Sequence, residues 1–135
     1  MAGSFSRTGE SHAVLLMAEI GLFQLVLSYQ VIAECEKNLR AKLPGGWAVF
    51  AALLTSANVL PVNDPPVEEI TQWLTYIEAK DAPILAAAVQ ADVDRLLTLN
   101  TKDFTPTVAR ASRLLIQQPG SFVQDIRALV TQGLA

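Results

Sequence analysis

KDAPILAAAVQADVDRLLTLNTKDF, residues 80–104 of this 135-residue chain, organises the rest of the expected fold. It predicts a helix of about ten residues and then a buried strand of about five, which rise ~15 Å and ~16 Å. The chain therefore goes out along the helix and returns along the strand. We expect Asp81, at the helix start, and Asn100, after the strand, at one edge of a sheet. Open α/β sheets bind ligands at that edge, outside the carboxyl ends of parallel strands.

Helices and short apolar strands alternate along the rest of the chain. Helices are expected near 12–20, 29–42, 47–56, 66–79 and 122–130. Strands are expected near 23–27, 58–61 and 96–99, with one more strand, or a short turn and strand, over 110–116. The alternation predicts an α/β fold, a three-layer α/β/α sandwich with a mostly parallel central sheet. No linker or repeat divides the chain, so residues 1–135 form a single predicted domain.

Composition narrows the class of protein. Apolar residues make up 51% and charged residues 17%, which predicts a full core and argues against disorder. A net charge of −3 excludes the bulk basic field of non-specific nucleic-acid binders. The single Cys35 excludes an internal disulfide and a cysteine-rich metal site. The first ten residues do not form a secretory signal, and Pro44 and Pro61 interrupt the uncharged stretch 43–63. A soluble, cytoplasmic domain without a membrane span is expected.

Polar residues gather at the predicted carboxyl edge. Asp81 stands at a helix start, Asn100 and Asp103 follow a strand, and a glutamate lies one turn into the helix after Ser28. Converging carboxylates repel one another, so a bound cation or a basic neighbour is needed to keep them charged. Oxygen ligands without His or Cys suit Mg²⁺ or Mn²⁺. The alternative is that Asp81 only caps its helix and Asp103 only caps a turn.

Two glutamates of helix 29–42 are candidates for the predicted cation site. Glu34 and Glu36 lie on opposite margins of the apolar stripe of helix 29–42. Either one could border a cleft, and periodicity alone does not choose between them.

Four pieces of the chain are similar to a known family. They are FQLVLSYQVIAECEKNLR (23–40), the stretch 80–104, its end TLNTKDF (98–104), and QPGSFVQDI (118–126). Together the pieces resemble a PIN domain, the fold of bacterial VapC-type toxins and related metal-dependent ribonucleases. The resemblance covers roughly residues 8 to 130.

The resemblance implies an Mg²⁺-dependent endoribonuclease, the toxin component of a toxin–antitoxin pair. It selects Glu34 over Glu36, and it makes Glu34, Asp81 and Asp103 metal ligands. Asn100 stands where many members carry a fourth acid, and would orient a water or hold a phosphate oxygen. An RNA substrate, a cognate antitoxin and a homodimer are further expectations. The candidate phosphate contacts are Arg7, Arg40, Lys80 and Lys102.

The chain also departs from the family pattern. PIN domains begin with a central apolar strand that ends in the first catalytic aspartate. Here no such strand precedes the helix at Ser11, and no aspartate precedes Asp64. The expected fold is therefore N-terminally truncated, and the alternative function is a catalytically impaired binding or interaction module. A generic nucleotide-binding domain is disfavoured because Pro44-Gly45-Gly46 is not part of a glycine-rich phosphate loop.

Overall fold

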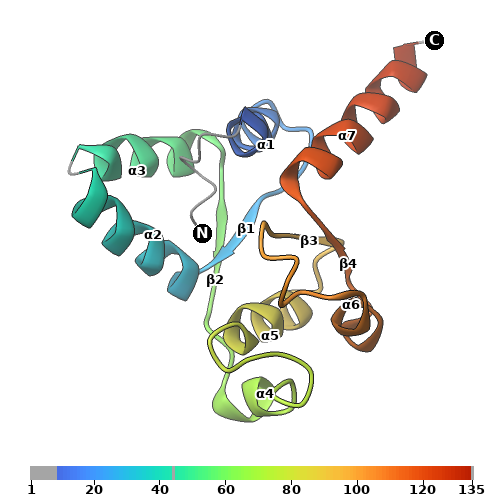
Figure 1. Cartoon of the computed structure of the whole chain (residues 1–135). Coiled ribbons are helices and arrows are strands. Elements are labelled where there is room, and N and C mark those ends of the chain that lie inside the picture. Colours follow the sequence, from blue (N-terminus) through green and yellow to red (C-terminus); the bar gives the residue numbers. More distant parts are fainter. Residues whose placement is uncertain (1–8, 44, 135) are drawn as a thin grey trace.

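The computed structural model describes residues 9–43 and 45–134, which are mixed α/β (Figure 1). The seven helices in these ranges are α1 (Gly9–Glu19), α2 (Tyr29–Lys42), α3 (Gly46–Ser56), α4 (Val67–Thr71), α5 (Ala82–Gln90), α6 (Pro106–Ser112) and α7 (Pro119–Leu134). The strands are β1 (Val26–Ser28), β2 (Leu60–Val62), β3 (Arg95–Leu97) and β4 (Leu115–Gln117). None of the described helices is both long and apolar enough to cross a membrane.

The four strands form two separate parallel pairs. β1 lies beside β2, with Leu27 opposite Pro61, and β3 lies beside β4, with Leu96 opposite Ile116. The α/β class and the parallel pairing are as expected from the sequence. In the described part of the chain, however, the pairs do not join into one central sheet. Each strand has only three residues, so each pair has few backbone groups with which to hydrogen-bond a further strand.

Helix α5 is the centre of the packing. Ala82 and Leu85 on this helix are fully buried, and with Ile77, Phe104 and Val108 they form one apolar cluster. Ile84 on the same helix packs against this cluster and against a second one, which joins β1, α2 and α3. A third cluster lies between α1 and α7, which adjoin at the top of Figure 1. The start of α5, next to Asp81, is therefore held by a cluster of buried apolar side chains.

Three helices end in the same way. After α1, the N–H of Gly21 bonds to Ala18 O (3.0 Å) and the N–H of Leu22 bonds to Met17 O (3.1 Å). This is a Schellman motif, and Gly21 takes the positive φ of 84° that it requires. Asn58 after α3 and Asp92 after α5 take the same role with φ of 53°. Gly21 therefore ends its helix as its residue type predicts.

Several predicted elements differ from the observed ones. The helix expected over 66–79 is only α4, and bonds such as Trp73 N to Ile70 O (3.1 Å) continue the chain as turns. These turns still bring Trp73 and Ile77 into the cluster beneath α5. Over 110–116, where a strand or a short turn and strand is expected, the chain forms the end of α6, a turn at Arg113 and the start of β4. The missed signal is Thr105, which caps α6 by accepting from Val108 N (3.3 Å), followed by Pro106 in the first turn.

Candidate metal centre

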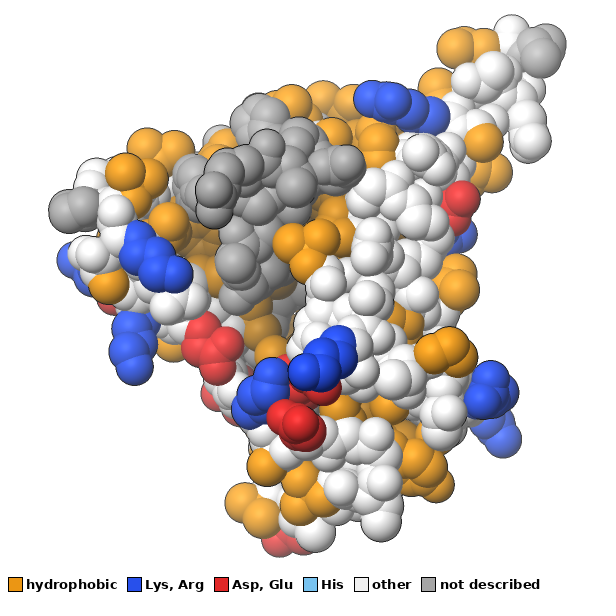
Figure 2. Space-filling view, in the orientation of Figure 1, with side chains coloured by type: hydrophobic (Ala, Val, Ile, Leu, Met, Phe, Trp, Pro, Cys, Tyr) orange, Lys and Arg blue, Asp and Glu red, His pale blue; other side chains and the backbone are white. Residues whose placement is uncertain are grey.

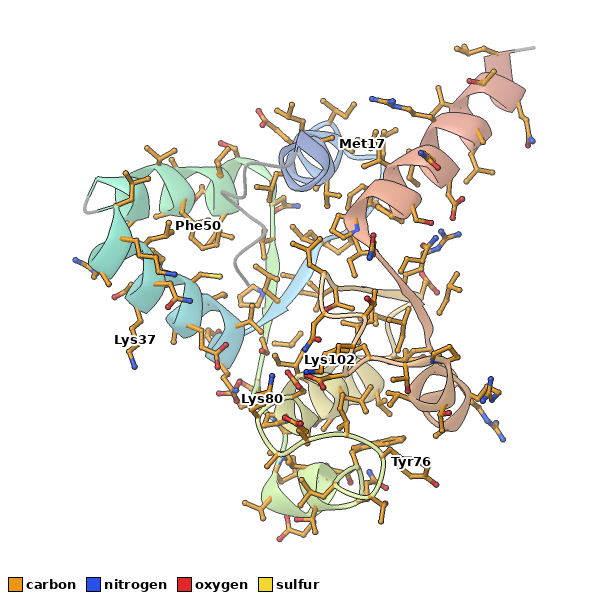
Figure 3. All side chains as sticks on the ribbon, viewed as in Figure 1. Met17, Lys37, Phe50, Tyr76, Lys80 and Lys102 are labelled. Carbon is orange, nitrogen blue, oxygen red and sulfur yellow. The ribbon has the colours of Figure 1, made fainter. Side chains whose placement is uncertain are left out.

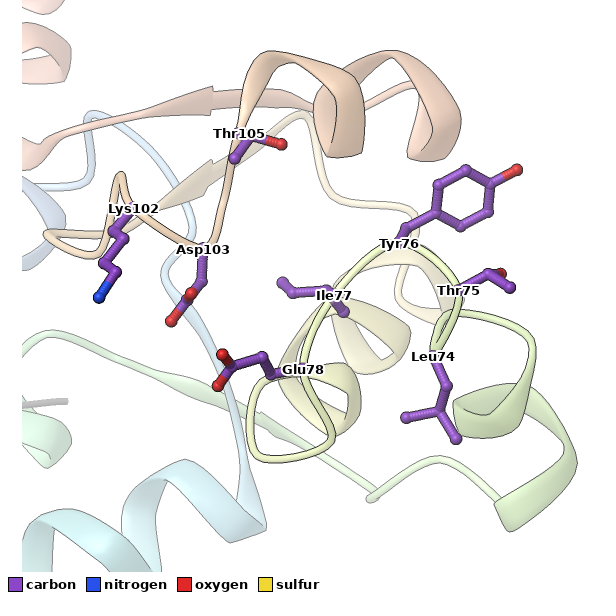
Figure 4. A pocket seen from close by; sticks show the side chains of 8 residues that line it. All are labelled: Leu74, Thr75, Tyr76, Ile77, Glu78, Lys102, Asp103 and Thr105. Carbon is purple, nitrogen blue, oxygen red and sulfur yellow. The ribbon is translucent and has the colours of Figure 1, made fainter.

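Three carboxylates meet at the start of α5. Glu78 comes from the turn before the helix, Asp81 immediately precedes it, and Asp103 comes from the loop after β3. One oxygen of each lies within 4.8 Å of the others. Figure 4 shows the Glu78 and Asp103 side chains reaching toward one another from these two segments. We call these three residues the acid cluster.

Asp81 is the most buried member of the acid cluster. It stands at the N-cap position of α5, yet its side chain makes no capping hydrogen bond. Its Oδ2 is buried and has no hydrogen-bond partner among the residues that the structure describes. Burial raises the pKa of Asp81, and the neighbouring Asp103 adds to this effect. The alternative in which the Asp81 side chain serves only as a helix cap is therefore wrong.

Asp103 is oriented by Asn100. The Asn100 side chain donates from Nδ2 to Asp103 Oδ2 (2.9 Å), and Asn100 Oδ1 accepts from Asp103 N (3.2 Å). Asn100 is itself held because its backbone N–H donates to Thr98 Oγ1 (3.0 Å). The hydrogen bonds from Asn100 and then Lys80 lower the pKa of Asp103. Asp103 is therefore ionised at any pH at which Asp81 is ionised.

Lys80 supplies a positive charge to the acid cluster. Its Nζ donates to Asp103 Oδ2 at 3.2 Å and lies 3.5 Å from Asp81 Oδ2. The hydrogen bond to Asp103 raises the pKa of Lys80. Three carboxylates and one ammonium still leave the site with a net negative charge, and such a charge attracts cations.

A cavity of about 390 Å³ adjoins the acid cluster. Its lining residues, all drawn in Figure 4, are Leu74, Thr75, Tyr76, Ile77, Glu78, Lys102, Asp103 and Thr105. Glu78 and Asp103 belong to both the cavity wall and the cluster, while Tyr76 and Leu74 add apolar surface that is about half exposed. Figure 2 shows acidic and basic side chains side by side on this face. Figure 3, in the same orientation, labels Lys80 and Lys102 at this place.

Three of the four predicted site residues lie together. Asp81 and Asp103 are in the acid cluster, and Asn100 is hydrogen-bonded to Asp103. The out-and-back path along α5 and β3 therefore brings Asp81 and Asn100 to one place, as the order of the two elements predicts, although β3 has three residues where about five were expected.

The structure does not place Glu34 in the acid cluster. Its side chain is exposed on α2, and its Oε1 accepts from Gln30 Nε2 (3.2 Å) on the preceding turn. Glu36 is likewise engaged on its own helix, 3.2 Å from Arg40 Nε. The start of α2 is held from elsewhere, because Asp64 Oδ1 accepts from Gln30 N (2.9 Å) and Ser28 Oγ accepts from Val31 N (3.3 Å).

Sequence reasoning missed Glu78. The available signal was its spacing of three residues from Asp81, which puts two side chains on one side of a helical turn. The turn forms because Asp81 N and Ala82 N both donate to Glu78 O at 3.0 Å. Of the candidate phosphate contacts, Lys80 and Lys102 lie at this site, Arg40 packs over the Trp47 ring, and Arg7 lies outside the described residues.

Comparisons of the chain with protein-family models, with curated proteins and with solved structures found no match.

Proposed function

We propose that this protein is an Mg²⁺-dependent endoribonuclease of the PIN type, the toxin component of a toxin–antitoxin pair. The observation that carries the proposal is the acid cluster, in which Asp81 holds a buried oxygen with no hydrogen-bond partner in the described part of the chain. A buried carboxylate oxygen left without a partner costs free energy unless a cation or a proton satisfies it. The PIN-like three-layer sandwich is part of the same proposal.

The donor set fits a hard cation. The cluster offers only carboxylate oxygens, and no His or Cys belongs to it, which favours Mg²⁺ or Mn²⁺ over zinc. The raised pKa of Asp81 records the cost of placing its charge in a buried position beside Asp103. A divalent cation would remove that cost, because it attracts both carboxylates at once.

Each residue has a separate task in this proposal. Asp81 and Asp103, with Glu78 at the exposed side, would hold the metal, which when bound supplies an activated water and stabilises charge on a phosphodiester. Asn100 keeps the Asp103 carboxylate in one orientation. Lys102, in the wall of the adjoining cavity, is available to a phosphate oxygen of RNA, and Tyr76 offers a half-exposed ring to a base.

Partners follow from the same proposal. A cognate antitoxin would cover the cavity beside the acid cluster. A homodimer is supported by the exposed apolar side chains of α7, where Leu129 is 59% and Leu134 83% exposed.

A second candidate function is a binding or interaction module that has lost catalysis. Two observations favour it. Asn100 stands where many members of the resembled family carry an acid, and the Lys80 ammonium already neutralises part of the cluster.

RNA cleavage separates the two functions. The wild-type protein should cleave single-stranded RNA with Mg²⁺ and not with EDTA. Asp81→Ala should lower the rate at least about 10- to 100-fold, since changes merely adjacent to metal ligands already cost that much. Asp94→Ala, at an exposed position between α5 and β3, is the matched control and should retain the rate. Cleavage that persists unchanged in Asp81→Ala would refute the proposed site.

A further inference from the structure

The side-chain ammonium of Lys80 lies within ion-pair distance of two members of the acid cluster, Asp81 and Asp103. Its ammonium is 3.2 Å from Asp103 Oδ2 and 3.5 Å from Asp81 Oδ2, so a single positive charge serves both carboxylates. Asp103 Oδ2 receives a second hydrogen bond from Asn100, whereas Asp81 Oδ2 receives none from any described residue. The ammonium therefore neutralises Asp81 by proximity and does not satisfy its buried oxygen.

The three groups differ in how firmly they are held. The Asp81 and Asp103 side chains are 10% and 15% exposed, whereas the Lys80 side chain is 65% exposed. The carboxylates are thus fixed by the packing around α5 and the Asn100 turn. Lys80 is held by charge at the end of a flexible four-carbon stem and can leave without any repacking of the core.

A divalent cation and the Lys80 ammonium cannot both occupy this position. Two cations within about 4 Å of the same oxygens repel each other strongly at the low effective dielectric of a half-buried site. Cation binding to Asp81 and Asp103 therefore has to push the ammonium outward.

We propose that Lys80 is a built-in counter-ion of the acid cluster, which competes with the divalent cation and is released when the cation binds. This inference rests on the proposed function, because it needs the acid cluster to be a cation site. It assigns to Lys80 control over the affinity of that site. Because the ammonium competes with the cation, a higher cation concentration is needed to fill the site.

Mn²⁺ titration by calorimetry, or by the electron paramagnetic resonance of free Mn²⁺, tests the competition. Lys80→Met should bind Mn²⁺ about 10-fold more tightly than the wild type. Lys102→Met is the matched control: it removes the same charge from the cavity wall, where no ion pair to the cluster is observed among the described residues. Its affinity should change only about two-fold, because screening weakens exposed charges that are not in contact.

A second readout uses the wild-type protein alone, so it does not depend on the folding of a variant. The chain has four lysines, at positions 37, 42, 80 and 102. With ¹³Cε-labelled lysine, the assigned signal of Lys80 should shift on Mg²⁺ addition toward the position of a free lysine. The Lys37 and Lys42 signals should remain in place.

The outcomes separate this inference from the proposed function. Equal Mn²⁺ affinity in wild type and Lys80→Met, with binding abolished by Asp81→Asn, would overturn the role of Lys80 and leave the metal site standing. Binding that Asp81→Asn does not weaken, or no saturable binding in any of these proteins, would overturn both.

Discussion

Asn100 and Asp103 hold each other through two hydrogen bonds, from Asn100 Nδ2 to Asp103 Oδ2 (2.9 Å) and from Asp103 N to Asn100 Oδ1 (3.2 Å). The Asn100 amide thus donates a hydrogen bond to the Asp103 carboxylate. An aspartate at position 100 would repel that carboxylate instead. The Asn100 amide also closes the turn that presents Asp103 to Asp81. Asn100 therefore orients Asp103, which we propose as a metal ligand, and does not itself need to bind the metal.

Asn100→Asp should make the protein depend more strongly on divalent cations. The substitution replaces a donor to Asp103 by a like charge, so the melting temperature without metal should fall at neutral pH. Added Mg²⁺ should raise the melting temperature of the variant more than that of the wild type, because a cation relieves the added repulsion. Differential scanning fluorimetry with and without Mg²⁺ measures both effects. An equal Mg²⁺ shift in the two proteins would contradict the position of Asn100 beside the site.

Substitutions of Glu78 and Glu34 distinguish the ligand set that the structure indicates, which includes Glu78, from the set that the family resemblance implies, which includes Glu34. Both are exposed glutamates, so truncating either should cost little stability, within about 0.5 kcal/mol. Glu78→Ala should weaken Mn²⁺ binding because its carboxylate belongs to the acid cluster, while Glu34→Ala should leave the affinity unchanged. Mn²⁺ titration of the two variants decides. The reverse order would show that Glu34 is the ligand, as the resemblance implies.

Asp81→Asn should stabilise the metal-free protein at neutral pH. The folded-state pKa of Asp81 is raised by burial, so its charged form opposes folding above that pKa. The advantage of the variant should shrink as pH falls through the raised pKa, because the wild-type carboxyl then becomes neutral as well. Melting temperatures between pH 4 and pH 8, in EDTA, test this. With Mg²⁺ the order should reverse, since only the wild type gains from the cation. A variant less stable than the wild type across the whole range would contradict the buried, unsatisfied state of Asp81.

Asp125 should show the opposite pH dependence. Gln117 and Arg95 each donate to Asp125 Oδ2 at 2.8 Å, and these contacts tie α7 to both strands of the β3–β4 pair. They lower the pKa of Asp125, so its contribution to stability is present above the unfolded-state value near 3.9 and is lost as pH falls through the folded-state value. Asp125→Asn should therefore lower the melting temperature at pH 7 and converge with the wild type in acid. Parallel curves without convergence would show that the charge of Asp125 is not responsible.

Asp92→Gly should raise stability. Asp92 has φ of 53° at the end of α5, a conformation that glycine adopts without the penalty of a side chain. The gain should be about 0.5–1 kcal/mol in urea unfolding. Asp94→Gly is the control: Asp94 is also exposed, lies two residues away and is not among the residues with positive φ, so the same substitution should destabilise there. A loss of stability in Asp92→Gly would contradict the observed helix end.

The features of this structure that the sequence predicts correctly depend on local sequence patterns. The order of a helix and then a strand brings Asp81 back to the Asn100 turn, Ser28 caps α2 and Gly21 ends α1. These features depend on a few neighbouring residues, so one sequence suffices to find them. The predicted match in length does not hold, because β3 has three residues where about five were expected.

The parts that were missed depend on tertiary contacts. The pairing of three-residue strands depends on which neighbours they meet, and no periodicity reports that the four strands form two pairs. Glu34 and Glu36 could not be distinguished by helix phase, and in the structure each is engaged on α2 itself. Glu78 was missed because the helix expected over 66–79 would have placed it near its end, whereas the chain there forms turns.

Anomalous diffraction from a crystal soaked in Mn²⁺ is the sharpest test of the metal site, because it locates the cation without any assay of activity. We expect a peak within coordination distance of Asp81 and Asp103, bordered by Glu78, with the Lys80 ammonium moved away. No peak at the acid cluster in a saturated crystal, or a peak held by Glu34 instead, would contradict it.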